Sequence, residues 1–174
     1  MYSSVFELES FSDNPICEAM PVNKRLDGLR VMLEALINVN RLWLRWNPIS
    51  PLYQYAPAYK MKVRPFGLDT WQDIPRTILM GSGDCKDFAC WRIAELREAG
   101  YADVSPRIKV TSVRGLTVYH IQVRSDLAVE DPSARLGMPK AVSEEVAKSL
   151  IVGEGGVDSI LEAQRTGRWY GNKR

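Results

Sequence analysis

The sequence predicts an α+β fold in which one central helix packs on a small antiparallel sheet, with further helices at the flanks. The first observation is the mostly apolar segment 85–99, which is closed by Gly100. The second is the pair of segments 107–113 and 117–124, in which apolar and polar residues alternate. A helix that is apolar around most of its circumference is buried on more than one side. Alternation is typical of strands that face the core on one side.

The length and composition are those of one domain spanning residues 1–174. Hydrophobic residues make up 45% and charged residues 25% of the chain, which are ordinary values for globular proteins, and this length supports a core without cross-links. The net charge of +2 gives no reason to expect a nucleic-acid partner. The sequence shows no apolar run of membrane-spanning length and no signal-peptide pattern. We therefore expect a cytoplasmic protein with no membrane partner.

The N-terminal part predicts an arm, a long helix and a proline-rich loop. Residues 1–23 predict a short strand or an extended arm. Leucines at helical spacing predict a helix over 24–46, with Asn23 as its cap. Between 47 and 67, prolines are dense enough to exclude a helix and predict an extended loop. The tyrosines of this loop either wall a groove for an extended peptide or, as we favour, form a belt on the core; they are Tyr53, Tyr55 and Tyr59.

A short helix is expected before the central one. It should span 69–80, with Asp69 or Thr70 as its cap and Pro75 in its first turn or breaking it. After the central helix, a turn at residues 114–115 should join the two alternating segments as a β-hairpin.

The C-terminal part predicts one more strand and two more helices. A third short strand is expected at 127–129, and helices at 143–151 and 157–165. Glycines 153, 155 and 156 lie between these helices and lack the context of a phosphate-binding loop. Residues 166–174 form a basic tail.

The three cysteines match neither a disulfide framework nor a zinc site, because their number is odd and their spacing is wrong for both. Cys85 and Cys90 lie five positions apart, so on a helix they point to different sides. Cys90 is expected to be a small buried hydrophobic residue, and Cys17 carries no signal. With one histidine and no CxxC pair in the chain, we expect no metal site.

Cys85, His120 and Asp131 together contain the groups of an activated sulfur nucleophile. Cys85 follows a tight glycine turn at the start of the central helix, where unpaired N–H groups favour a thiolate. Together with an adjacent imidazolium, this position predicts a standing thiolate. The N–H of Cys85 is also a candidate donor to an oxyanion. His120, the only histidine, lies on the more polar face of its strand and can act as the base. Asp131 can orient the imidazole and stabilise its charged form.

Two further residues are candidates for shaping the site. Trp71 and Gln72 lie upstream of the cysteine, and Gln72 is a candidate second oxyanion donor on the basis of residue type. Each feature alone is more often structural: a cysteine at a helix start, a histidine in a strand, and an Asp-Pro turn. Their occurrence in this order, with the expected helix and strands, supports the functional interpretation.

These residues resemble the transglutaminase-like superfamily, a branch of the papain-like cysteine protease fold. The resemblance covers roughly residues 68–137 and rests on Trp71, His120, Asp131-Pro132-Ser133 and the run Gly83-Asp84-Cys85-x-Asp87-Phe88-Ala89. It implies that Cys85 is the nucleophile, His120 the base and Asp131 the carboxylate. It also implies hydrolysis or transfer of acyl groups at amide bonds of a peptide or protein substrate, without a cofactor. Many members carry an aromatic residue where this chain has Gln122.

The stretch from Trp71 to Met138 is also similar to compact transglutaminase-like proteins encoded by tailed bacteriophages. Two functions are therefore open. The first is a thiol-dependent amide hydrolase or acyl transferase. The second is a non-catalytic structural component of the virion or of its assembly, which uses the same fold as a scaffold. In that case residues 1–23 and 166–174 are the expected contacts with other virion proteins, and the chain is incorporated in a phage virion.

Overall fold

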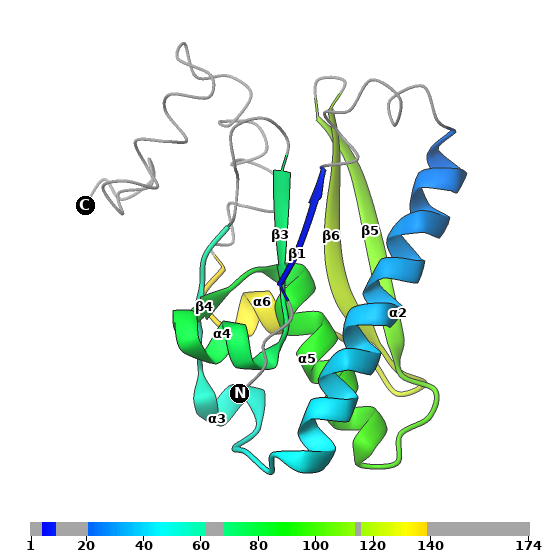
Figure 1. Ribbon diagram of the computed structural model, residues 1–174. Coiled ribbons are helices and arrows are strands. Elements are labelled where there is room, and N and C mark those ends of the chain that lie inside the picture. Colours follow the sequence, from blue (N-terminus) through cyan, green and yellow to red (C-terminus); the bar gives the residue numbers. More distant parts are fainter. Residues whose placement is uncertain (1–4, 10–20, 62–67, 114–115, 139–174) are drawn as a thin grey trace, which may run out of the picture.

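The computed structural model describes residues 5–9, 21–61, 68–113 and 116–138. The predicted helices at 143–151 and 157–165, the tail 166–174 and Cys17 lie outside these ranges. Within them the chain has the predicted α+β composition (Figure 1), with these elements in order: β1 (Val5–Glu9), α2 (Val22–Trp46), α3 (Leu52–Tyr55), β2 (Ala58–Tyr59), β3 (Leu68–Gln72), α4 (Ile74–Met80), β4 (Ser82–Gly83), α5 (Cys85–Glu98), β5 (Ser105–Val113), β6 (Leu116–Arg124), β7 (Val129–Glu130) and α6 (Pro132–Arg135).

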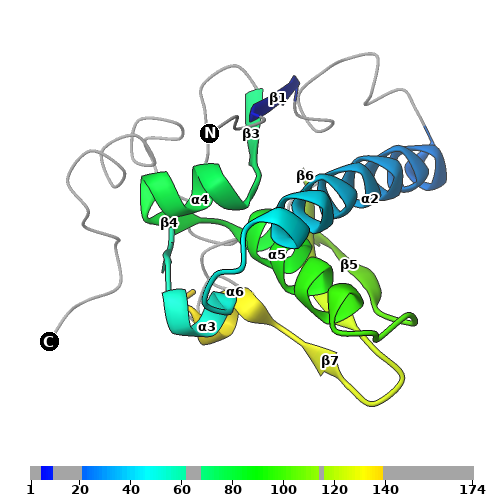
Figure 2. The same ribbon diagram turned by 60° about the horizontal axis from the view of Figure 1, so that its bottom comes forward.

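Helix α5 is the central element, as predicted. Its side chains contribute to two buried clusters on different sides of the helix. Cys90 and Ile93 pack in the larger cluster, together with residues of α2, β3 and β6. Phe88 and Trp91 pack in the second cluster, with residues of α3 and α4. Figure 2 shows α2 running beside α5 and the β5–β6 hairpin on another side of it. The apolar circumference of α5 is therefore explained by burial on several sides.

The sheet that bears the histidine is a three-stranded antiparallel sheet in the order β5-β6-β7. The predicted hairpin is confirmed, and its strands begin slightly earlier than expected. The third strand lies at residues 129–130 rather than 127–129, with Val123 opposite Glu130. Ile121 and Val123 are buried in the larger cluster. Strand alternation therefore places His120 and Gln122 on the opposite face of β6, as expected.

The segment 69–80, expected to be one helix, is a strand followed by a helix. Strand β3 pairs antiparallel with β1, with Phe6 opposite Trp71, and α4 begins only at Ile74. The helix cap is Asp73, which accepts a hydrogen bond from the N–H of Arg76 at 2.9 Å. The predicted caps Asp69 and Thr70 were therefore wrong, whereas Pro75 lies in the first turn as one alternative proposed. The partner strand β1 lies within the expected N-terminal arm.

Two predictions about the N-terminal half need correction. Helix α2 begins at Val22 after Pro21, and Asn23 is helical rather than the cap. The proline-rich loop is not free of helix: α3 forms a single turn directly after Pro51. A proline that precedes a helix has its ring outside the hydrogen-bonded turn and does not oppose helix formation.

The tyrosines of this loop pack mainly as a belt. Tyr53 and Tyr59 are partly buried against the second cluster. Tyr55 is more exposed, but its ring centroid lies 5.9 Å from that of Trp91.

Candidate functional site

Cys85 is the first residue of α5, and one buried carboxylate fixes the chain around it. Asp87 is 1% exposed. It accepts hydrogen bonds from the N–H of Asp84 at 3.0 Å and from the N–H of Gln72 at 2.8 Å. The first bond belongs to a capping box formed with Asp84, the N-cap of α5. Asp87 therefore ties the end of β3 to the beginning of the cysteine helix.

Gly83 is needed immediately before this cap because the chain passes very close to Phe88. If residue 83 had a Cβ atom, that atom would lie 2.6 Å from Cε1 of Phe88, which is fully buried. The glycine of the sequence motif therefore serves close packing of the turn on its own helix.

Trp71 lies beneath the helix start rather than at an open surface. It is 4% exposed and belongs to the larger core cluster. The Nζ atom of Lys86, which pairs with the carboxylate of Asp84, lies 5.9 Å from the centre of the Trp71 ring. Trp71 thus supports the residues on either side of Cys85 through packing and a cation–π contact.

His120 and Asp131 form a direct pair. The Nε2 atom of His120 lies 2.7 Å from Oδ2 of Asp131, and Nε2 of Gln122 donates to the same oxygen at 3.2 Å. The other oxygen accepts the N–H of Ala134 at 3.1 Å, because Asp131 also caps α6. Burial opposes ionisation of Asp131, but the bonds from His120, Gln122 and Ala134 outweigh it and hold the pKa of this carboxyl below its ordinary value.

The ionised state of Asp131 determines the tautomer of the histidine. A carboxylate can only accept hydrogen bonds, so Nε2 of His120 carries the hydrogen of this bond. In the neutral ring, Nδ1 is then the unprotonated nitrogen and the basic atom. This is the role that a carboxylate plays beside a catalytic imidazole.

The structure brings Cys85 to the same part of β6. The backbone of Ile121, the residue after His120, forms a hydrogen bond with the Cys85 sulfur. Cys85 also packs against the cluster that contains Ile121. Tyr59 lies near both Cys85 and Asp131, because both groups influence the pKa of its hydroxyl. The start of α5 therefore lies against β6 next to the residue that follows His120, while His120 itself is paired with Asp131.

The expected standing thiolate is wrong for the resting protein. Burial, together with the negative charge of Asp84, raises the pKa of Cys85 to about 12, and Asp87 acts in the same direction. The charge of Lys86 and the hydrogen bond from Ile121 favour the thiolate but do not prevail. Cys85 is therefore a thiol at neutral pH, and its sulfur needs a base that removes the proton during reaction.

Gln72 is held next to the helix start through its backbone bond to Asp87. It is 5% exposed, and its side-chain Oε1 has no hydrogen-bond partner among the described residues. Its use as an oxyanion donor remains a prediction. The N–H of Cys85 is better placed in principle, because the first N–H groups of a helix have no acceptor within the helix.

Sequence reasoning missed two residues of this region. Asp87 had a usable signal, since an acidic residue three positions after an N-cap Asp84 matches the capping-box pattern. Tyr59 had none. It comes from the proline-rich loop through the parallel pairing of β2 with β4, in which Tyr59 lies opposite Gly83. Burial raises the pKa of Tyr59, and the negative charge of Asp84 acts in the same direction, so its hydroxyl stays protonated.

The chain was compared with protein families, curated proteins and solved structures, and no match was found in any of the three. Among the residues that the structure describes, no three His, Cys, Asp or Glu side chains form a group suited to a metal ion. None of the helices in the described ranges has the length and apolar character needed to cross a membrane. The chemistry of the site therefore has to be derived from the geometry of this chain.

Proposed function

We propose that this protein is a transglutaminase-like, thiol-dependent amide hydrolase or acyl transferase that acts on a peptide or protein. The observation that carries the proposal is the 2.7 Å bond between His120 and Asp131, on a strand whose next residue contacts the Cys85 sulfur. A nucleophile, a base and a group that orients the base are the three components of covalent acyl transfer.

The proposed reaction begins with transfer of the Cys85 proton to Nδ1 of His120 while the sulfur attacks the carbonyl carbon of the amide. Asp131 stabilises the imidazolium that forms. As the tetrahedral intermediate collapses, the imidazolium gives its proton to the departing amine nitrogen, and a thioester remains on Cys85. Water, or a second amine, then attacks the thioester and loses a proton to His120, and that proton returns to the sulfur. The cycle needs no oxidant, metal or cofactor.

The raised pKa of Cys85 determines how this first step proceeds. Because the resting sulfur is protonated, the reaction depends on His120 as a general base in the attacking step. The oxyanion of the intermediate needs at least one donor, and the N–H of Cys85 and the side chain of Gln72 are the proposed ones.

We expect an activated acyl donor to label Cys85 in the absence of the natural substrate. The wild-type protein, mixed with p-nitrophenyl acetate, should release a burst of nitrophenol and gain one acetyl group on Cys85 in an intact-mass and peptide-mass measurement. Decay of this adduct in water reports hydrolysis, and faster decay with an added primary amine reports transfer. Acetylation restricted to lysines, with no burst, contradicts the proposal.

The raised pKa of Cys85 also favours a second candidate, the non-catalytic virion or assembly scaffold. In that case the fold is kept and the thiol is simply buried. Part of the proposed N-terminal contact arm is already used within the chain, because β1 pairs with β3, so partners are left to the remainder of 1–23 and to 166–174. A silent Cys85→Ala substitution, combined with loss of assembly on truncation of 166–174, supports this candidate, whereas truncation of 1–20 also removes β1 from its pairing with β3.

A further inference from the structure

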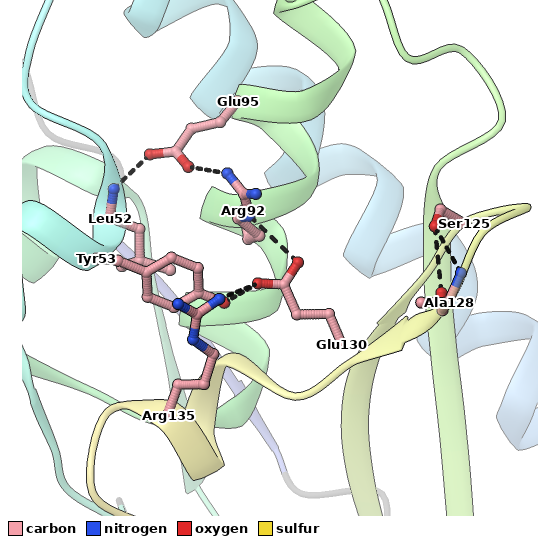
Figure 3. Close-up of polar contacts among 8 residues, drawn as sticks. All are labelled: Leu52, Tyr53, Arg92, Glu95, Ser125, Ala128, Glu130 and Arg135. Carbon is pink, nitrogen blue, oxygen red and sulfur yellow. Dashed lines mark hydrogen bonds and ion pairs between the residues drawn. The ribbon is translucent and has the colours of Figure 1, made fainter.

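A second polar network surrounds Glu130, the residue that immediately precedes Asp131. Figure 3 shows Tyr53, Arg92 and Arg135 converging on the Glu130 carboxylate. The hydroxyl of Tyr53 donates to Oε1. Nε of Arg92 lies 3.3 Å from Oε2, and Nη1 of Arg135 lies 3.4 Å from Oε1. Three helices, α3, α5 and α6, thus hold one side chain of β7.

The network closes into a ring through Glu95. Arg92 donates to Oε2 of Glu95 at 3.1 Å, and Oε1 of Glu95 accepts the N–H of Leu52 at 2.6 Å. Leu52 is the first residue of α3 and the neighbour of Tyr53. The ring therefore runs from α3 through two carboxylates and one guanidinium on α5 and β7, and back to α3 (Figure 3).

The groups of this ring are partly shielded from water, which strengthens their interaction. The side chains of Glu130 and Arg92 are each 23% exposed, and that of Glu95 is 13% exposed. The guanidinium of Arg135 lies 3.8 Å and that of Arg92 5.3 Å from the centre of the Tyr53 ring. Partly buried, charge-assisted bonds with several partners hold geometry better than isolated surface ion pairs do.

The backbone around Asp131 is supported unequally on its two sides: after it, Pro132 and Ser133 are buried and Leu136 packs against the second cluster, whereas before it the strand gives little support. Strand β7 is only two residues long, and its ladder with β6 ends at Glu130. Asp131 must nevertheless hold His120 on one oxygen and the first turn of α6 on the other. The side chain of Glu130 is therefore the polar contact that fixes the strand side of this junction against α3 and α5, beside the apolar packing of α6.

We propose that Glu130 is a positioning residue: anchored by Tyr53, Arg92 and Arg135, it sets the place of Asp131 and, through it, the orientation and tautomer of His120. This inference rests on the proposed function for its effect on catalysis. Its structural part concerns His120 alone and can be measured separately.

The test uses Glu130→Gln, which keeps the size of the side chain and removes its charge. Because the chain has one histidine, a nitrogen-15 NMR spectrum of the imidazole reports His120 without ambiguity. The wild-type neutral ring should show the Nε2–H tautomer. In Glu130→Gln, and more weakly in Tyr53→Phe, we expect a mixture of tautomers. Acetylation by the nitrophenyl ester should also slow about tenfold, because small displacements of catalytic groups are costly.

Glu98→Gln is the matched control. Glu98 also accepts bonds from two arginines, Arg41 at 2.7 Å and Arg45 at 2.9 Å, and its side chain is likewise 23% exposed. It lies at the far end of α5, about 20 Å along the helix axis from Cys85. This variant should keep the wild-type tautomer and acetylation rate.

A double substitution separates positioning from general loss of structure. Combining Glu130→Gln with Asp131→Asn should slow acetylation no further than Asp131→Asn alone, because the first acts through the second. The inference is overturned if Glu130→Gln leaves the imidazole spectrum unchanged, or if Glu98→Gln changes it equally. If the wild type is not acetylated at Cys85 but Glu130→Gln still changes the tautomer, the proposed function fails and the positioning role stands.

Discussion

Cys85→Ala is expected to abolish acyl turnover and leave the fold intact. Removing the nucleophile of a covalent mechanism lowers the rate by about 10⁴-fold or more, down to the background of binding and oxyanion stabilisation. Folding should survive because Cys85 is the first residue of α5 and alanine is an excellent helix former. Turnover of an ester or peptide substrate, measured beside the circular dichroism spectrum, checks both parts.

Cys90→Ala is the matched control for this prediction. Cys90 lies on the same helix, is 0% exposed, and its sulfur lies 3.7 Å from the carbonyl oxygen of Leu33. Its loss creates a small cavity and lowers the free energy of unfolding by about 1 kcal/mol, but it should leave turnover unchanged. Full activity in Cys85→Ala contradicts the enzyme interpretation, and equal losses in both variants point to a folding defect.

Asp87→Ala should have the largest effect on stability. The substitution leaves the buried N–H groups of Gln72 and Asp84 without their acceptor. An unsatisfied buried donor costs about 1–3 kcal/mol, so with two donors the free energy of unfolding should fall by about 2–6 kcal/mol. Urea unfolding measures this loss, and acetylation of Cys85 should fall with it because the helix start is no longer tied to β3.

Asp27→Ala provides the comparison. Asp27 forms an exposed ion pair with Arg30 at 3.0 Å, and both side chains are about 60% exposed, so its loss should cost less than about 1 kcal/mol. A similar small cost for Asp87→Ala means that water or other groups replace the carboxylate, and the structural role given to Asp87 is then wrong.

Side-chain periodicity along the sequence predicted the helices and strands whose formation depends mainly on neighbouring residues. The apolar circumference of α5 and the alternation of β5 and β6 both follow from side-chain periodicity, and both elements are present. The strand β3 could not be read in this way. It forms because β3 pairs with β1, where Trp71 lies opposite Phe6, more than sixty positions earlier. A pattern of a few consecutive residues cannot predict such a distant pairing.

The site shows the same division between local and distant causes. The order of Cys85, His120 and Asp131 led to the prediction of a histidine–carboxylate pair, which the structure contains at 2.7 Å. The protonation state of Cys85 was predicted from its helix position and from a neighbouring imidazolium. It is decided instead by burial and by the charges of Asp84 and Asp87. Tyr59 reaches the site only through the pairing of β2 with β4, which no motif marks.

The rate of alkylation of Cys85 by iodoacetamide, compared between the wild type and His120→Ala, tests most directly whether His120 removes the proton from this sulfur. The wild type should react faster at Cys85 than at Cys90, which is 0% exposed on the same helix, at neutral pH. His120→Ala should lower the rate of Cys85 alkylation at least about tenfold, because a thiol of high pKa has almost no thiolate without a base. Equal rates in the two proteins contradict the account, since Cys85 then reacts without help from the imidazole.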